Sequence, residues 1–310
     1  MRGEGFGIRA AAACIGILYL AAFVYIRIIS GSELPEMRKN ISAALYAECE
    51  TAIEGTMPED PRGRAFAKAL FLGDKSEISR EDKEYFRISG VSHLLALSGM
   101  HLSILYGIFT VLTSFIPSGR AGTAVRSTVN VSLLFIYSLM TGMANSIARA
   151  FVMIFIYETG KILGRKQKPL WVLALSAIII LSYNPEAAAD VGFQLSYSAM
   201  IGIFTIFPYL KDLIYTKNRA MKYIWNTIAL SVACQISTLP LILWYFGYFP
   251  KYFLVTNLLC VPLSSVILAL IMTSMLAFAI WPPAGIFCGK ILSCSIDILV
   301  WITESVSALP

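Results

Sequence analysis

The residues best suited to chemistry lie in one stretch of small and apolar residues, Gly90 to Ser103, which contains both histidines of the chain, His93 and His101. An imidazole can bind a metal ion or carry a proton. On one helix, a spacing of eight residues places the two rings about 80° apart and two turns away from each other, which is poor geometry for a single ion. We therefore expect no metal site in this stretch.

Ser98 lies in the same stretch, within the run Ala96 to Gly99, which is similar to the Gly-x-Ser-Gly nucleophile motif of intramembrane serine proteases. The leading glycine of that motif is missing. His101 follows Ser98 by three residues on the same expected helix, an awkward approach for a general base. The sequence also lacks a Gly-rich phosphate loop and a Walker motif. We therefore expect no catalytic residue, no cofactor and no enzyme, and keep a serine hydrolase as a minor alternative.

Wound as one helix from Gly90 to Ile116, the stretch has two neighbouring stripes. One stripe carries His93, Leu97 and His101, and ionisable groups at membrane depth usually face a partner or a wet cavity. The other stripe is small, which lets membrane helices approach closely. Its members are Ser92, Ala96, Gly99, Ser103 and Gly107. The stretch is thus predicted to line a path on one side and to pack tightly on the other, with Ser98 and Gly99 as a packing or hinge element.

The elements that must position these residues are membrane spans. The 310 residues are 57% hydrophobic and 14% charged, with a mean hydropathy of +0.70, which excludes an ordinary soluble globule. We predict an all-α polytopic membrane protein with about nine transmembrane helices, some of them kinked or broken at prolines such as Pro240 and Pro262. The expected spans are 10–29, 90–116, 126–141, 147–163, 170–181, 192–209, 223–248, 252–281 and 286–308.

The chain is predicted to divide into three parts. Residues 1–29 form an N-terminal transmembrane anchor, residues 30–89 an extracellular or periplasmic loop, and residues 90–310 the transmembrane domain. The loop carries both signs of charge, and its segments 64–72 and 79–87 have the spacing of short amphipathic helices lying on the membrane surface. Because it has no long strand pattern, we expect no separate folded domain within it.

The loop cations predict the orientation. If the spans alternate, all short-loop Lys and Arg residues except Lys251 fall on one side, which the positive-inside rule assigns to the cytoplasm. The N-terminus is then cytoplasmic, while residues 30–89 and the C-terminus lie outside.

Polar side chains recur near the outer ends of several expected spans. Asp190, Gln194 and Ser198 follow one another at helical spacing, and Arg149 opens another span. Each alone could cap a helix or bond to a neighbouring one, but their shared depth favours a polar vestibule. The predicted path residues are His93, His101, Arg149, Asp190, Gln194, Ser198, Gln235 and Asn257. Packing or hinge roles are further predicted for Gly192, Ser196, Pro240 and Pro262.

Several runs together resemble the signature of the ComEC/Rec2 competence proteins. The runs are Ala69 to Asp74, Phe86 to Gly90, Ser92 to His101, Ser146 to Ala150, Asn184-Pro185, Gly192 to Ser196, Ser237 to Pro240, Phe246-Gly247, Asn257 and Pro262. Members of that family are believed to form the channel in the bacterial cytoplasmic (inner) membrane that imports single-stranded DNA during natural transformation. The resemblance implies that role here, with Arg149 and His93 meeting phosphates at the outer entrance.

The resemblance also implies partners. These are single-stranded DNA, the lipid bilayer, a cytoplasmic ATPase or helicase motor, an extracellular DNA receptor, a separate nuclease and further copies of the chain. The OB-like and metallo-β-lactamase-like domains of larger members have no counterpart in these residues, since the 30–89 loop is too short for a barrel and no HxHxD-type ligand set is present. A proton-coupled transporter of small solutes or ions, relaying protons through Asp190, His93 and His101, is the main alternative.

Overall fold

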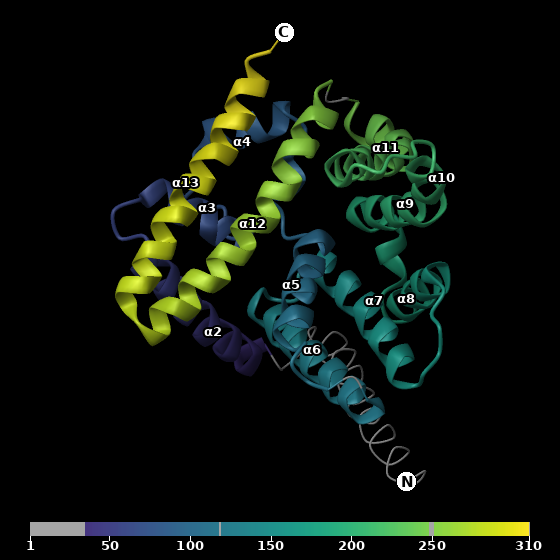
Figure 1. Ribbon diagram of the computed structural model, residues 1–310, viewed down its shortest axis with the longest axis horizontal. Helices are drawn as coiled ribbons and strands as arrows, with labels where there is room; N and C mark the ends of the chain where they lie inside the picture. The colour runs from purple at the N-terminus through teal and green to yellow at the C-terminus, as the bar shows by residue number, and fades with distance from the viewer. Residues whose placement is uncertain (1–34, 118, 248–250, 310) are drawn as a thin grey trace. The chain divides into compact units, whose positions relative to one another are not determined.

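The regular elements are helices. The computed structural model describes residues 35–117, 119–247 and 251–309, and no strand occurs within these ranges (Figure 1). The α-helices in chain order are α2 (Pro35–Thr56), α3 (Pro61–Phe71), α4 (Arg80–Ile88), α5 (Gly99–Leu112), α6 (Arg120–Met140), α7 (Asn145–Ile162), α8 (Pro169–Tyr183), α9 (Val191–Thr205), α10 (Phe207–Lys211), α11 (Arg219–Phe246), α12 (Phe253–Ile280) and α13 (Pro282–Ser307). Two short 3-10 helices, η1 (Ser92–Leu94) and η2 (Pro185–Ala189), complete the set.

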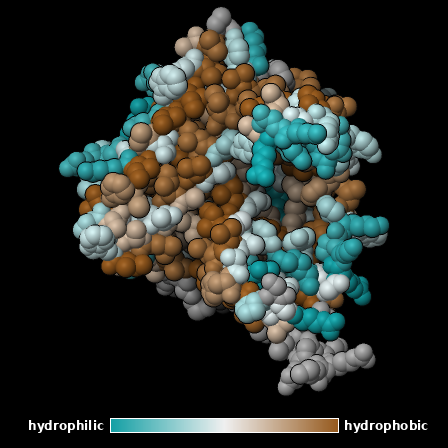
Figure 2. Space-filling view, viewed as in Figure 1, coloured by the Kyte–Doolittle hydropathy of each residue, from teal (hydrophilic) through white to brown (hydrophobic). Residues whose placement is uncertain are grey.

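The helices include several that fit a bilayer. Among the described residues, α6, α11, α12 and α13 are long and apolar enough to cross a membrane, and α5, α8 and α9 are shorter apolar helices. Large apolar side chains are exposed along the α12–α13 hairpin, where Figure 2 shows a broad hydrophobic surface, and they include Val266, Leu276, Phe287, Ile298 and Trp301. Such a surface suits contact with lipid. The predicted all-α membrane class is confirmed, whereas the count of nine spans stays a prediction and the span at 10–29 lies outside the described residues.

Two compact units make up the chain. Of the described residues, the first unit comprises those within 35–46 and 99–190, and the second comprises those within 47–98 and 191–309. These boundaries differ from the three predicted parts, whose assignment to membrane sides stays a prediction.

In the first unit, α7 is the central helix and packs against α5, α6 and α8. Its core is aromatic, since the rings of Phe135 and Phe151 lie 5.6 Å apart and those of Phe151 and Phe155 lie 6.3 Å apart. Leu134 and Ile147 are fully buried beside them. Apolar burial of this kind holds α7 in place and so fixes the depth of the polar side chains it carries.

In the second unit, α12 and α13 form a hairpin that packs against α3, and α4 packs on α13. The hairpin turns at Trp281, and α13 begins directly after it with Pro282 and Pro283. Proline is well suited to the first positions of a helix, so these residues favour a new helix start there. On the far side of α12 lies α11, which also packs against α9 and α10. Both α11 and α12 continue through their internal prolines, Pro240 and Pro262, so neither helix is broken there, and a kink at these prolines stays a prediction.

The prediction of one helix from Gly90 to Ile116 is wrong. Gly90 has a left-handed φ of 80°, η1 follows, and α5 starts only at Gly99. Val91 and Leu94 are fully buried in the second unit. An apolar run can be a docking segment as well as a span, and periodicity does not separate the two.

The predicted small stripe is consequently split between two elements. Ser92 and Ala96 precede the start of α5, while Gly99 and Ser103 lie on it. Gly99 does pack closely, since an added Cβ would lie 3.3 Å from the Cβ of Ala150 on α7, whereas Gly107 faces open space. The Ser103 hydroxyl donates a hydrogen bond to the Gly99 carbonyl at 2.8 Å. Close approach of α5 to α7 therefore rests on Gly99.

The expectation that residues 64–72 form a surface helix is also wrong. Residues Ala65 to Leu72 are all buried, and the Phe66 ring lies 5.6 Å from that of Phe86 on α4. Lys68, only 3% exposed, places its ammonium 2.8 Å from Glu54, 2.9 Å from Glu50 and 2.9 Å from Glu77. The ammonium thus joins α2, α3 and the loop before α4, which lets a basic helix be buried.

The Lys68 cluster predicts an acid-sensitive contribution to stability. Burial disfavours the Lys68 charge, but hydrogen bonds to Glu54, Glu77 and Glu50 outweigh it and raise the pKa of Lys68. The hydrogen bond from Lys68 lowers the pKa of Glu54 below its ordinary 4.5. A lowered carboxyl pKa stabilises the fold above the unfolded value, and this contribution is lost as the pH falls through the folded value. Between neutral and acidic pH, the midpoint temperature of thermal unfolding should therefore fall more steeply for the wild type than for Lys68→Met. If the midpoint temperatures of the two proteins fall in parallel, the cluster has no such role.

A second prediction concerns the close contact of α2 with α13. An added Cβ at Gly289 would overlap the backbone carbonyl of Thr56, which cannot move as a flexible side chain can. Gly289→Ala should lower the unfolding free energy by about 1–3 kcal/mol, as overpacking does. Gly107→Ala, on a helix with open space at that position, is the matched control and should be neutral or slightly stabilising. Thermal unfolding in detergent measures the stability of both variants. If Gly289→Ala and Gly107→Ala change the stability equally, Gly289 is not needed for the contact of α13 with α2.

Candidate functional site

The first unit brings together Arg149 and Asp190, two of the predicted path residues. Arg149 lies in the second turn of α7 and is 6% exposed, while Asp190 follows η2. The guanidinium Nη1 and carboxylate Oδ1 are 3.9 Å apart, and the Asp190 side chain is 45% exposed. This is a loose ion pair with one buried partner, and it reduces the positive charge that Arg149 presents.

His101 belongs to the same unit and is fully buried in the first turn of α5. Since Gly99 packs on Ala150, the starts of α5 and α7 lie against each other, and these starts carry His101 and Arg149. The local arrangement therefore gathers an imidazole, a guanidinium and a carboxylate near one end of the helices of this unit. His93 lies elsewhere, exposed on η1 in the second unit, so a His93–His101 stripe on one helix does not exist.

In the second unit, the α9–α11 interface contains Gln194 and Ser198. The Tyr245 hydroxyl donates to Gln194 Oε1 at 3.0 Å, and the Ser198 hydroxyl donates to the Ser237 carbonyl. The helices come close because Gly202 has no side chain, and an added Cβ there would overlap Ser237. This interface keeps the predicted polar face of α9 against α11.

Gln235 on α11 and Asn257 on α12 have buried polar atoms of a different kind. Among the described residues, Gln235 Nε2 and Asn257 Oδ1 have no hydrogen-bond partner. An unsatisfied donor and an unsatisfied acceptor in apolar helices are costly, so they usually meet water or a ligand. The two helices that carry them pack against each other, and both atoms belong to the predicted path set.

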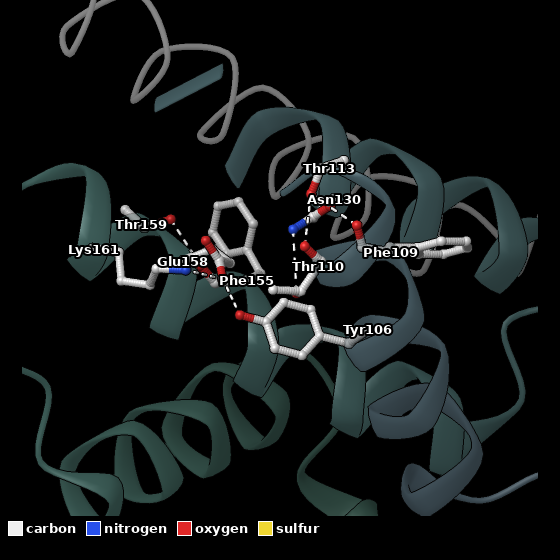
Figure 3. A network of polar contacts seen from close by, with 9 residues as sticks. All are labelled: Tyr106, Phe109, Thr110, Thr113, Asn130, Phe155, Glu158, Thr159 and Lys161. Atoms are coloured by element: carbon white, nitrogen blue, oxygen red, sulfur yellow. Dashed lines mark hydrogen bonds and ion pairs between the residues drawn. The ribbon is translucent and has the colours of Figure 1, made fainter. Parts of the chain in front are cut away.

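The sequence analysis missed a network in the first unit. Figure 3 shows Tyr106 of α5 and Lys161 of α7 reaching the carboxylate of Glu158, and Asn130 of α6 bonded to Thr110 and Thr113. A signal existed, because Glu158 is the sole acidic residue between positions 99 and 185. Glu158 lies inside the expected span 147–163, three positions before Lys161.

The remaining predictions concern metal ligands and the packing or hinge residues of α9, α11 and α12. Among the described residues, no group of three or more His, Cys, Asp or Glu side chains could hold a metal ion. Gly192 and Ser196 lie on α9, and Pro240 and Pro262 lie inside α11 and α12. Their hinge roles stay predictions.

These observations define a class: a multi-pass, all-α membrane protein with polar and charged side chains among its apolar helices. The chain belongs to the competence protein family, which it matches over residues 70–310.

It is 29% identical to ComE operon protein 3 of Bacillus subtilis over 209 residues, which are 66% of this chain and 25% of that protein. It is 22% identical to Recombination protein 2 of Haemophilus influenzae over 209 residues, or 64% of this chain and 26% of that protein. An uncharacterized protein of Escherichia coli, YcaI, is 21% identical over 232 residues, 73% of this chain and 30% of that protein. The chain thus spans about a quarter of the length of these relatives. No solved structure matches it.

The unsatisfied amide of Gln235 predicts that its removal does not destabilise the fold. Gln235→Leu removes a buried orphan donor and should keep or raise the unfolding free energy, by up to about 1 kcal/mol. Ser198→Ala removes a made hydrogen bond and should lower it by about 1 kcal/mol. Thermal unfolding of the purified variants measures the difference. Gln235 is a structural residue instead of a path residue if its variant is destabilised as much as Ser198→Ala.

Proposed function

We propose that this chain is part of a membrane channel that imports single-stranded DNA during natural transformation. Membership of the competence protein family over residues 70–310 carries the proposal. The names of two relatives, ComE operon protein 3 and Recombination protein 2, agree with it. Since the chain matches only about a quarter of each, the role is proposed for the membrane helices that they share.

The chemistry of the helices suits this task. A single strand brings one phosphate charge per nucleotide into an apolar layer, so its path needs water, polar groups and cations. The buried Arg149 supplies a cation, and Gln235 and Asn257 supply polar atoms that the described residues leave unsatisfied. Gln194 and Ser198 lie on α9 at the same helical spacing as predicted.

The proposal extends to placement and partners. The chain lies in the bacterial cytoplasmic membrane with its N-terminus in the cytoplasm, and residues 30–89 and the C-terminus lie outside. This orientation follows if the predicted spans alternate, since the short-loop cations except Lys251 then lie on one side. A cytoplasmic ATPase or helicase supplies energy, an extracellular receptor delivers DNA, a separate nuclease removes the other strand, and copies of the chain assemble. The chain itself has no catalytic role.

A specific observation keeps the second candidate, a proton-coupled transporter of small solutes. His101 and Asp190 both have side chains that can carry a proton and both belong to the first unit, where Arg149 lies 3.9 Å from Asp190. A pH-dependent solute flux in proteoliposomes without DNA would favour this candidate over the channel. Normal transformation in a strain deleted for the gene would end the DNA proposal.

The Arg149–Asp190 pair predicts opposite effects of two substitutions. Arg149→Gln removes a cation, and we expect it to weaken binding of a labelled single strand roughly tenfold and to lower transformation. Asp190→Asn removes the acid 3.9 Å from the guanidinium and should strengthen binding at low salt. Fluorescence anisotropy with the protein in lipid nanodiscs measures the affinity, and complementation of the deletion strain measures transformation.

Lys290→Gln, an exposed cation on α13, is the control for a general loss of charge and should change little. If Arg149→Gln and Lys290→Gln weaken binding equally, Arg149 has no special place on the path.

A further inference from the structure

Glu158 lies in an unusual position for an acid in this chain. It is on α7, fully buried, in a helix that packs against α5, α6 and α8. It is also the sole acidic residue between positions 99 and 185, where the sequence has several Arg and Lys residues. An ionisable group at such a site is costly in an apolar environment, and in membrane proteins it commonly has a function.

The two carboxylate oxygens of Glu158 have different surroundings. Oε1 accepts hydrogen bonds from the Tyr106 hydroxyl and from the Lys161 ammonium, the latter at 2.8 Å (Figure 3). Oε2 is buried and has no partner among the described residues. A carboxylate whose role is purely structural normally has both oxygens satisfied. The bare Oε2 is therefore an open position on a buried acid.

The groups around the carboxylate indicate which ligand that position takes. Lys161 and Tyr157 come from α7, with the ammonium 5.6 Å from the Tyr157 ring centroid. Tyr106 comes from α5. From α6, Asn130 supplies the network nearby, and the cation Arg126 lies one turn before it. On α8 the one ionisable side chain is that of Tyr183, at the last position of the helix. With the Lys161 ammonium already at Oε1, a metal ion would be repelled, whereas a proton on Oε2 removes the carboxylate charge.

The network connects the buried acid to a partly exposed side chain on one side and to the helix core on the other. The Lys161 side chain is 29% exposed, and its ammonium lies 2.8 Å from Glu158. The Tyr106 hydroxyl also interacts with Thr110, which accepts a hydrogen bond from Asn130 Nδ2 at 3.4 Å. Thr113 in turn donates to Asn130 Oδ1 at 3.1 Å. A continuous set of hydrogen-bonding side chains thus runs from Lys161 through Glu158 into α5 and α6.

We propose that Glu158 is a proton-binding site within the membrane helices, with Tyr106 and Lys161 as its positioning residues. In the step, the carboxylate takes one proton from a hydronium ion that reaches the exposed side of Lys161, and it becomes a neutral acid while water is left behind. Uptake of the proton breaks the ion pair with Lys161 and leaves the ammonium charge uncompensated at this end of α7. Release of the proton restores the pair. This site does not depend on the proposed transport of DNA.

Infrared difference spectroscopy of the full chain in lipid nanodiscs, titrated from about pH 9 to about pH 4, tests the site without DNA. The wild type should gain the carbonyl band of a buried protonated carboxyl, and Glu158→Gln should lose that band. Glu158→Asp should keep it with a changed midpoint, which shows that loss in Glu158→Gln is not misfolding. Glu186→Gln, which removes an exposed acid of the same unit, is the matched control and should leave the band unchanged.

Substitution of the positioning residues should change the pH midpoint of the carbonyl band, which a purely structural role of these residues would leave unchanged. Tyr106→Phe and Lys161→Met each remove a hydrogen-bond donor to Oε1, so the midpoint of the band should differ from that of the wild type in both variants. The proposal is overturned if the wild type shows no such band in this range, if Glu158→Gln retains it, or if neither positioning variant moves its midpoint.

Discussion

Every part of this fold depends on the shortage of water around apolar helices. Backbone groups are satisfied within each helix, but a polar side chain among the spans must find a partner from another element or remain costly. Some side chains meet this demand by pairing, as Ser198 does with the backbone of α11. Pairing is incomplete at Glu158, Gln235 and Asn257, each of which has a buried polar atom without a hydrogen-bond partner among the described residues.

Glycines decide where such pairing between helices is possible. Gly99 lets α5 approach α7, Gly202 lets α9 approach α11, and Gly289 lets α13 approach the end of α2. In apolar surroundings there is little hydrophobic drive between helices, so close van der Waals contact and interhelical hydrogen bonds hold them together. The hydrogen bond from Ser198 to α11 and the contact at Gly202 occur one turn apart on the same interface. At this interface, the close contact at Gly202 and the hydrogen bond of Ser198 thus both hold α9 against α11.

Charge is distributed differently in the two units. Around α3, burial of a lysine is balanced by three partly exposed glutamates, which makes a basic helix part of the core of the second unit. In the first unit, the buried Arg149 has a loose, half-exposed acid, and the buried Glu158 has a partly exposed lysine. Each of these pairs thus joins one buried member to one partly exposed member.

The sequence by itself determined the class of protein, most helix positions and the family resemblance, because hydropathy, helical spacing and short motifs are local properties. Seven of the expected spans coincide with helices, whose ends lie within about six residues of the predicted ones: α6, α7, α8, α9, α11, α12 and α13. Four of these, α6, α11, α12 and α13, are long and apolar enough to cross a membrane. Only the tertiary structure decided that the run from Gly90 is a docking segment followed by a new helix, that α3 is buried, and that Arg149 meets Asp190. It also revealed Glu158, whose partner Tyr106 lies 52 positions away. Contacts of this kind follow from how separate helices pack, and a pattern along one segment contains no record of its neighbours.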